Sequence, residues 1–242
     1  MTKLSNEREV DAIFRGFCIA NGAKQLAYPV IAGSGPNAGT LHYDDNNQPL
    51  AGRQLICMDA GAEWFCYASD VTRTFPISGS FSPEAAAIHA IVTRMQEECI
   101  QRVRPGVLFQ ALHIHACAVA VIELLRLGIL HNGTAAEILQ RGTVAAFFPH
   151  GLGHHVGLEV HDVSGTDRLL HASYGVPKGP FRSDGGQYST RGGAAGKRQF
   201  ISADSLGQIY RDSFVETQTG MGKQPHKQVL EKDMVVTIEP GM

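Results

Sequence analysis

The sequence predicts an α+β fold, in which helices and strands follow one another irregularly along a chain of 242 residues. Three long segments have helical signals, at residues 5–22, 80–103 and 108–127. Short apolar segments before, between and after them have the length and composition of strands. Because the alternation is irregular, an α+β arrangement is favoured over a doubly wound parallel sheet.

The first helix is expected within residues 5–22. Its apolar residues recur at helical spacing and predict one apolar face: Val10, Ile13, Phe14 and Phe17. Gly22 can end this helix. Extended segments are expected next in four places: residues 27–33, 40–43, 54–61 and 64–68.

The later helices have clear boundaries. Ser82 is a favourable N-cap residue, and Pro83 is tolerated in the first turn of the second helix. The third helix, at residues 108–127, is more apolar and is stopped by Gly128. Three further elements are expected after it: a short helix at residues 134–140 and strands at residues 156–163 and 234–241.

Composition limits the kinds of partner. The formal net charge of −2 gives no reason to expect nucleic acid or an anionic membrane. The longest apolar segment, residues 116–130, is interrupted by Glu123 and Arg126, so a buried helix explains it better than a membrane span. The polar N-terminus and five scattered cysteines indicate a reduced, cytoplasmic protein. We expect one domain over residues 1–242, with a flexible insertion at residues 175–196, where Gly, Ser, Pro and Arg are frequent.

Two aspartates, Asp59 and Asp70, lie eleven positions apart among mostly apolar, aromatic and small residues. A carboxylate in such surroundings has to be paired, hydrogen-bonded or bound to a metal. Gly61 could let the chain turn back, which would bring both carboxylates to one place. Taken alone, however, the pair is better explained as aspartates that cap turns at strand ends.

A glycine-rich apolar segment contains four histidines within twelve positions: His150, His154, His155 and His161. Gly151 and Gly153 argue against a helix and suggest backbone that lies close to something bound. A regular strand would place His154 and His161 on opposite faces, so an irregular backbone is needed if both serve one site. Chance packing is a poor explanation for this density, and we interpret the segment as functional.

The third motif contains Glu239, which ends an apolar strand and precedes a Pro-Gly pair. Taken alone, a turn explains it better than a site. In order, however, the strings DAGAEWFCYASDVTRTF, HGLGHHVGLEVHDV and TIEPG resemble those of the M24-type metallopeptidases with the pita-bread fold. The likeness is greatest to Xaa-Pro aminopeptidases and prolidases. The upstream string AGSGPNAGTLHY resembles the segment that supplies their substrate-side histidine.

This resemblance implies a pita-bread metal domain with two Mn²⁺ ions per subunit. Asp59 would bind one ion through both oxygens and Asp70 would bridge the two. His154 and Glu239 would bind the second ion, and mostly carboxylate ligands with one imidazole suit manganese. The family's further bridging glutamate and closing strands are expected to lie beyond residue 242. The chain is therefore expected to be truncated at both ends, with a weakened second metal site and doubtful activity.

The reaction implied by the resemblance is hydrolysis of the peptide bond between an N-terminal residue and a penultimate proline, through metal-activated water. His161 would contact the substrate or intermediate in catalysis, and His42 and His150 would bind substrate. The implied partner is a peptide with proline at position 2, and a homodimer is left open. Two alternatives remain: a non-catalytic module of the same fold that binds peptides or proteins, and an incomplete chain with exposed sheet edges that does not fold stably.

Overall fold

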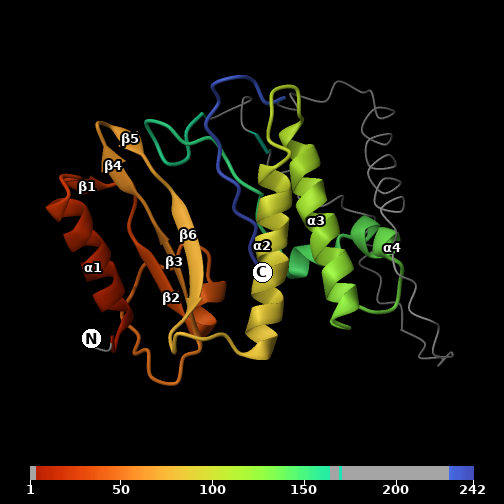
Figure 1. The fold of residues 1–242 in the computed structure, drawn as a ribbon, viewed down its shortest axis with the longest axis horizontal. Coiled ribbons are helices and arrows are strands. Elements are labelled where there is room, and N and C mark those ends of the chain that lie inside the picture. Colours follow the sequence, from red (N-terminus) through yellow and green to blue (C-terminus); the bar gives the residue numbers. More distant parts are fainter. Residues whose placement is uncertain (1–3, 164–168, 171–228) are drawn as a thin grey trace, which may run out of the picture.

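The computed structural model describes residues 4–163, 169–170 and 229–242, and the insertion expected at residues 175–196 lies outside them. Two antiparallel sheets form the first part of the chain. The first sheet has the order β2-β3-β6 and consists of β2 (Ile31–Ser34), β3 (Leu55–Ala60) and β6 (Val71–Pro76). The second has the order β1-β4-β5 and consists of β1 (Gln25–Leu26), β4 (Ala62–Trp64) and β5 (Tyr67–Ala68). Figure 1 shows α1 (Glu7–Ala20) on one side of these strands and the remaining α-helices on the other.

Helix α1 forms where the spacing predicted it. The side chain of Asn6 caps it by accepting a hydrogen bond from Arg8 N at 3.0 Å. Only half of its predicted apolar face packs against other elements, because α1 contacts β1 and β2 through Val10 and Phe14. Ile13 and Phe17, on the same apolar face, remain 58% and 68% exposed.

The later helices begin and end as expected. Helix α2 (Pro83–Ile100) is capped by the hydroxyl of Ser82, which accepts a hydrogen bond from Ala85 N at 3.2 Å. Helix α3 (Phe109–Arg126) ends just before Gly128, which has a φ of +75°. Helix α4 (Ala135–Gln140) starts with a capping box between Thr134 and Glu137. By length and composition α3 could cross a membrane, but 67% of it is buried inside the protein, as expected of a core helix.

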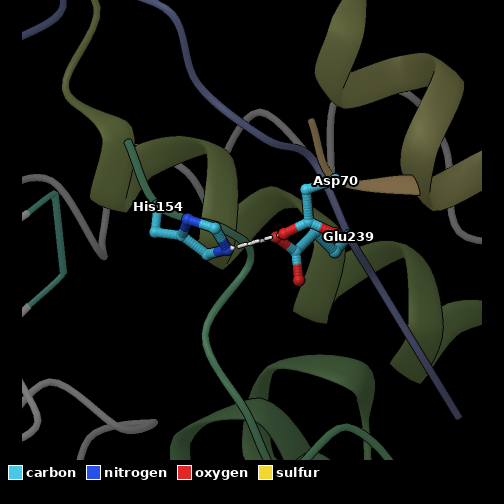
Figure 2. Close-up of side chains that lie close together, drawn as sticks. All are labelled: Asp70, His154 and Glu239. Atoms are coloured by element: carbon cyan, nitrogen blue, oxygen red, sulfur yellow. Dashed lines mark ion pairs between the residues drawn. The ribbon is translucent and has the colours of Figure 1, made fainter. Parts of the chain in front are cut away.

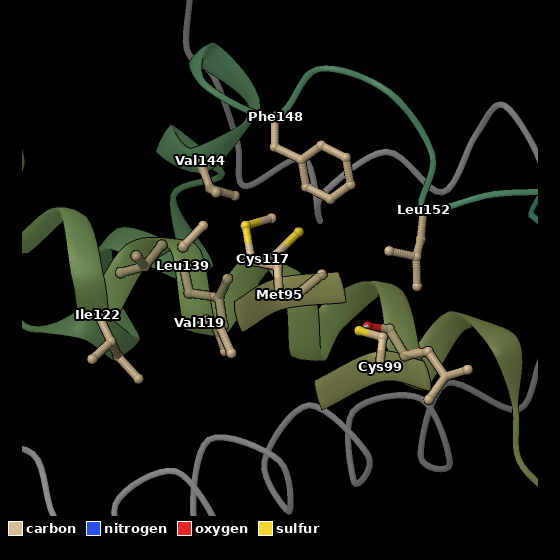
Figure 3. Packing of buried hydrophobic residues seen from close by; sticks show 14 of the residues in the cluster. Met95, Cys99, Cys117, Val119, Ile122, Leu139, Val144, Phe148 and Leu152 are labelled. Atoms are coloured by element: carbon tan, nitrogen blue, oxygen red, sulfur yellow. Dashed lines mark hydrogen bonds between the residues drawn. The ribbon is translucent and has the colours of Figure 1, made fainter. Parts of the chain in front are cut away.

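Two separate apolar cores hold the molecule together. The larger one lies between α2, α3, α4 and the short 3-10 helix η2 (Thr143–Ala146), and Figure 3 shows its packing. Its most deeply buried side chains include Met95, Cys99, Phe109, Val144, Phe148 and Leu152. The smaller core joins α1 to the β2-β3-β6 sheet through Val10, Val30, Ala32, Leu50, Ile56 and Ala60.

The strand expected at residues 64–68 is instead a hairpin of β4 and β5. Phe65 and Cys66 form its turn with φ values of +48° and +68°. A two-residue turn with both residues at positive φ normally carries Asn or Gly. The sequence lacks that signal, which is why the hairpin was missed.

Three other expected strands are irregular. Residues 40–43 follow the 3-10 helix η1 (Gly35–Gly39) as a turn, with His42 at a φ of +56°. Residues 156–163 also form turns, joined to neighbours by isolated bridges. Residues 234–241 run beside residues 152–156, held by single hydrogen bonds such as Glu239 N to Leu152 O at 2.7 Å. In Figure 1 these two segments lie between the strands and α2.

Candidate metal centre

The two aspartates of the first motif meet at one end of the β2-β3-β6 sheet. Asp59 lies in β3 opposite Thr72 of β6, and Asp70 directly precedes β6. The chain between them turns at Phe65 and Cys66, and its two arms approach closely at Gly61, where a Cβ atom would lie 1.6 Å from the carbonyl oxygen of Ser69. Only glycine permits that approach. The two carboxylates meet as expected, but the chain reverses at the β4–β5 turn rather than at Gly61.

Tyr28 joins the two aspartates. Its hydroxyl lies 2.5 Å from Oδ1 of Asp59 and 2.7 Å from Oδ1 of Asp70. Burial, together with hydrogen bonds to both carboxylates, raises the pKa of Tyr28 well above its ordinary value, so the phenol keeps its proton. The same Gly61 makes room for the ring, because a Cβ there would lie 2.9 Å from Cε1 of Tyr28.

His154 and Glu239 reach the aspartates through the irregular pairing of two distant segments. Thr237 N donates to His154 O at 2.9 Å, and His154 N donates to the Thr237 hydroxyl at 2.9 Å. Gly153 allows this contact, since a Cβ there would lie 2.2 Å from the carbonyl oxygen of Thr237. The glycines were predicted to bring the backbone close to something bound, but the close neighbour of Gly153 is another segment of the protein.

Figure 2 shows the three side chains that converge: Asp70, His154 and Glu239. One ligand atom from each lies within 4.8 Å of the others. Nε2 of His154 is 3.3 Å from Oδ2 of Asp70 and 2.8 Å from Oε1 of Glu239. Asp59 lies outside this group and is linked to it through Tyr28. Three of the four predicted ligands therefore meet, and the fourth lies beside them.

The donor set fits a divalent cation. Three carboxylates and one imidazole offer oxygen and nitrogen ligands of the kind that manganese and related ions accept. In addition, Oε1 of Glu239 is buried and, within the described part of the chain, receives no hydrogen bond of acceptable geometry, although His154 lies close. A buried carboxylate oxygen that lacks a donor is costly unless a cation compensates it.

The charges in the centre influence one another strongly. Burial would lower the pKa of His154, but the approach of Asp70 and Glu239 raises it to about 10. Burial would raise the pKa of Asp70, but hydrogen bonds with His154 and Tyr28 outweigh it and lower that pKa. The pKa of Asp59 is raised by burial and by the charge of Asp70, despite the hydrogen bond from Tyr28. Excess negative charge is thus distributed around one imidazole.

Two of the substrate-side histidines predicted from the sequence lie in a row with His154. The ring centroids of His154 and His161 are 4.3 Å apart, and those of His161 and His42 are 6.4 Å apart. The third, His150, packs edge-on against Phe148 at 4.9 Å, and a Cβ at Gly241 would lie 3.0 Å from its Nε2. His42 and His161 thus extend the centre on one side, as an irregular backbone was expected to allow.

The comparisons with known proteins agree with this geometry. The profile of metallopeptidase family M24 matches residues 1–242. The chain belongs to metallopeptidase family M24. A probable Xaa-Pro aminopeptidase of Sordaria macrospora is 51% identical over an alignment of 248 residues, which covers 99% of this chain and 42% of that protein. One of Chaetomium globosum is 69% identical over 168 residues, covering 69% of this chain and 28% of that protein. The M24 chain thus spans less than half the length of these relatives.

Solved structures match as well. A variant of Escherichia coli aminopeptidase P superposes with a TM-score of 0.70 at 27% identity, covering 97% of this chain and 40% of that one. The zinc-substituted form of that enzyme, in complex with product, has a TM-score of 0.64 at 34% identity over 66% of this chain and 36% of that one. The predicted M24 fold, with mixed helices and strands, is confirmed.

Two residues of the M24 centre were missed by the sequence reasoning. Tyr28 stands 31 and 42 positions before the aspartates it contacts, and no local pattern marks it. Thr237 lies two positions before Glu239 and binds the backbone of His154, 83 positions earlier. Its only sequence signal is a hydroxyl in an apolar segment that already carries a candidate ligand.

Proposed function

We propose that this M24 chain carries the metal-binding part of a peptidase that hydrolyses the bond between an N-terminal residue and a penultimate proline. The observation that carries the proposal is the convergence of Asp70, His154 and Glu239 within 4.8 Å, with Asp59 tied to them by Tyr28. The names of the curated relatives, probable Xaa-Pro aminopeptidases, support the choice of substrate.

Manganese is the ion we propose for the centre. Asp59, Asp70, Glu239 and His154 would hold it, since mostly oxygen ligands with one imidazole suit Mn²⁺. A bound divalent ion supplies an activated water and polarises the scissile carbonyl. Around it, Asp70 presents Oδ2 toward His154 while its Oδ1 stays on Tyr28. The hydrogen bond from Tyr28 therefore holds Asp70 with Oδ2 directed toward the other ligands.

His161 and His42 are proposed to act on the substrate. His161 adjoins His154, and partial burial lowers its pKa below the ordinary value. It is then neutral at pH 7 and offers one N–H donor and one acceptor to a peptide group or its tetrahedral successor. His42 lies on the far side of His161, where it can contact the substrate or pass on a proton.

The test is peptide hydrolysis by the purified chain with manganese chloride. We expect release of alanine from Ala-Pro-Ala, little release from Ala-Ala-Ala, and complete loss of activity on addition of EDTA. Ala-Pro, offered as a dipeptide, distinguishes prolidase from aminopeptidase activity. A His161→Ala variant should keep its manganese and lose about 100-fold or more in rate.

Two outcomes of this test count against the proposal. Equal hydrolysis of Ala-Pro-Ala and Ala-Ala-Ala would contradict the proline specificity. Manganese binding without hydrolysis of either peptide would instead support a non-catalytic binding module of the same fold. The chain carries less than half the length of the relatives it matches, so the same assay on a longer protein that contains it separates a missing segment from a wrong site.

A cytoplasmic location is also part of the proposal. All five cysteines are free in the structure, and Cys66 is exposed on the β4–β5 hairpin. Free, exposed thiols are typical of reducing compartments. Fractionation of cells with an antibody against the chain would test this directly.

A further inference from the structure

The Tyr28 hydroxyl occupies a particular place among the carboxylates. It contacts Oδ1 of both Asp59 and Asp70. Asp70 consequently turns its other oxygen, Oδ2, toward Nε2 of His154, 3.3 Å away. In the described part of the chain, Asp70, His154 and Glu239 converge, and Asp59 lies outside this group of three. Its carboxylate reaches that group through the phenol and through a direct interaction with Asp70.

The phenol itself is held rigidly. Ala27 N, one residue before Tyr28, donates to Gly61 O at 2.9 Å. Gly61 also faces the ring, because a Cβ there would lie 2.9 Å from Cε1 of Tyr28. The close approach at Gly61, between the two aspartates, thus also positions the tyrosine that contacts them. A fixed donor of this kind limits the rotation of both carboxylates, which a mobile water could not do.

We propose that Tyr28 is a positioning residue of the metal centre, which holds Asp59 and Asp70 so that their remaining oxygens face the ion. This inference rests on the metal site of the proposed function. Groups that hydrogen-bond to metal ligands orient them, and their loss typically lowers metal affinity about 10–100-fold. The effect is expected to be greatest for the ion that depends on Asp59, since the other ligands already converge on Asp70.

The chain contains a matched control for this change. The Tyr43 hydroxyl donates to Oε2 of Glu7 at 2.7 Å, and Glu7 is a buried carboxylate of α1 outside the metal centre. Tyr43→Phe and Tyr28→Phe remove the same atom from the same kind of hydrogen bond. They differ in whether the carboxylate belongs to the metal centre.

The experiment is isothermal titration of manganese chloride into the wild-type chain, Tyr28→Phe and Tyr43→Phe, with thermal unfolding of each metal-free protein as a check of folding. We expect a loss of affinity of about 10–100-fold for Tyr28→Phe and less than about twofold for Tyr43→Phe. Unchanged affinity in Tyr28→Phe, or an equal loss in Tyr43→Phe, would overturn the inference.

A double-mutant cycle covers the case in which Tyr28→Phe is destabilised. If Tyr28 acts through Asp59, adding Tyr28→Phe to Asp59→Asn should cost less than about threefold in affinity beyond Asp59→Asn alone. Fully additive losses would indicate general damage and overturn the positioning role. A wild-type chain that binds no manganese would instead defeat the proposed function itself, so the two failures are distinguishable.

Discussion

Two groups of carboxylates in this molecule are surrounded in opposite ways. Glu7, in the first turn of α1, is fully buried. Its two oxygens accept hydrogen bonds from five donors: Ser34 N, Ser34 Oγ, Asn37 Nδ2, Tyr43 OH and Gln48 N. Burial would raise the pKa of Glu7, but these hydrogen bonds outweigh it and lower that pKa to about 2. Glu7 is a saturated anion that needs no further partner.

The metal centre has the opposite balance. Asp59, Asp70 and Glu239 have one phenol, one imidazole and the Thr72 hydroxyl close by, and Oε1 of Glu239 is left without a hydrogen bond in the part of the chain described. Both groups contain a tyrosine that donates to a carboxylate. The number of donors per oxygen, rather than burial or charge, therefore separates a carboxylate that holds the fold together from one that is ready for a cation.

The sharpest way to break this comparison is to remove one charge from the metal centre. Asp70→Asn should lower manganese affinity by more than about 100-fold, because even the hydrogen-bonding partners of ligands are worth about 10–100-fold. Titration calorimetry measures the effect. The control is Asp233→Asn, since that side chain is 83% exposed and should leave affinity unchanged. Tight binding by Asp70→Asn would refute the assignment of the centre.

The next effect concerns the backbone that brings His154 to Glu239. Gly153→Ala would place a Cβ 2.2 Å from the carbonyl oxygen of Thr237, so the two segments must separate. We expect a loss of about 3 kcal/mol in the free energy of unfolding, measured with urea, together with weaker manganese binding. Gly16→Ala in α1 is the control. Its added methyl meets nothing within 4 Å and should stabilise the chain by about 0.5–1 kcal/mol.

A change at Glu7 should have the reverse signature. Glu7→Gln replaces one acceptor oxygen by an NH₂ group that faces existing donors, and should cost about 2 kcal/mol in the free energy of unfolding. Manganese affinity should change by less than about twofold, because Glu7 lies outside the centre. Urea unfolding measures the loss of stability, and calorimetry of the same samples measures the manganese affinity. A large loss of metal affinity with unchanged stability in Glu7→Gln would contradict the distinction between Glu7 and the carboxylates of the metal centre.

Glu7 also brings a pH dependence of stability to the wild-type chain. Its folded pKa of about 2 lies below the ordinary value of 4.5, so its contribution to stability is complete above pH 4.5 and is lost as the pH falls toward 2. Urea unfolding across that range should show a steeper decline for the wild-type chain than for Glu7→Gln. Parallel declines would show that other acids dominate.

The sequence by itself determined the local boundaries and the chemistry of the centre. The helix start at Ser82 followed from capping, which depends on residues within one turn. The acidic and imidazole side chains of the three motifs identified the class of site, because few other environments favour such a set in apolar surroundings. These signals are short in range, so they can be recognised before the chain is folded.

Only the tertiary structure decided which groups meet. Tyr28 reaches Asp59 and Asp70 across 31 and 42 positions, and Thr237 reaches His154 across 83. The left-handed turn at His42 also went against local expectation, and the packing of α1 left Ile13 and Phe17 exposed. Such contacts depend on how separate elements pack and on close backbone approaches at a few glycines, and neither is encoded in the periodicity of any one segment.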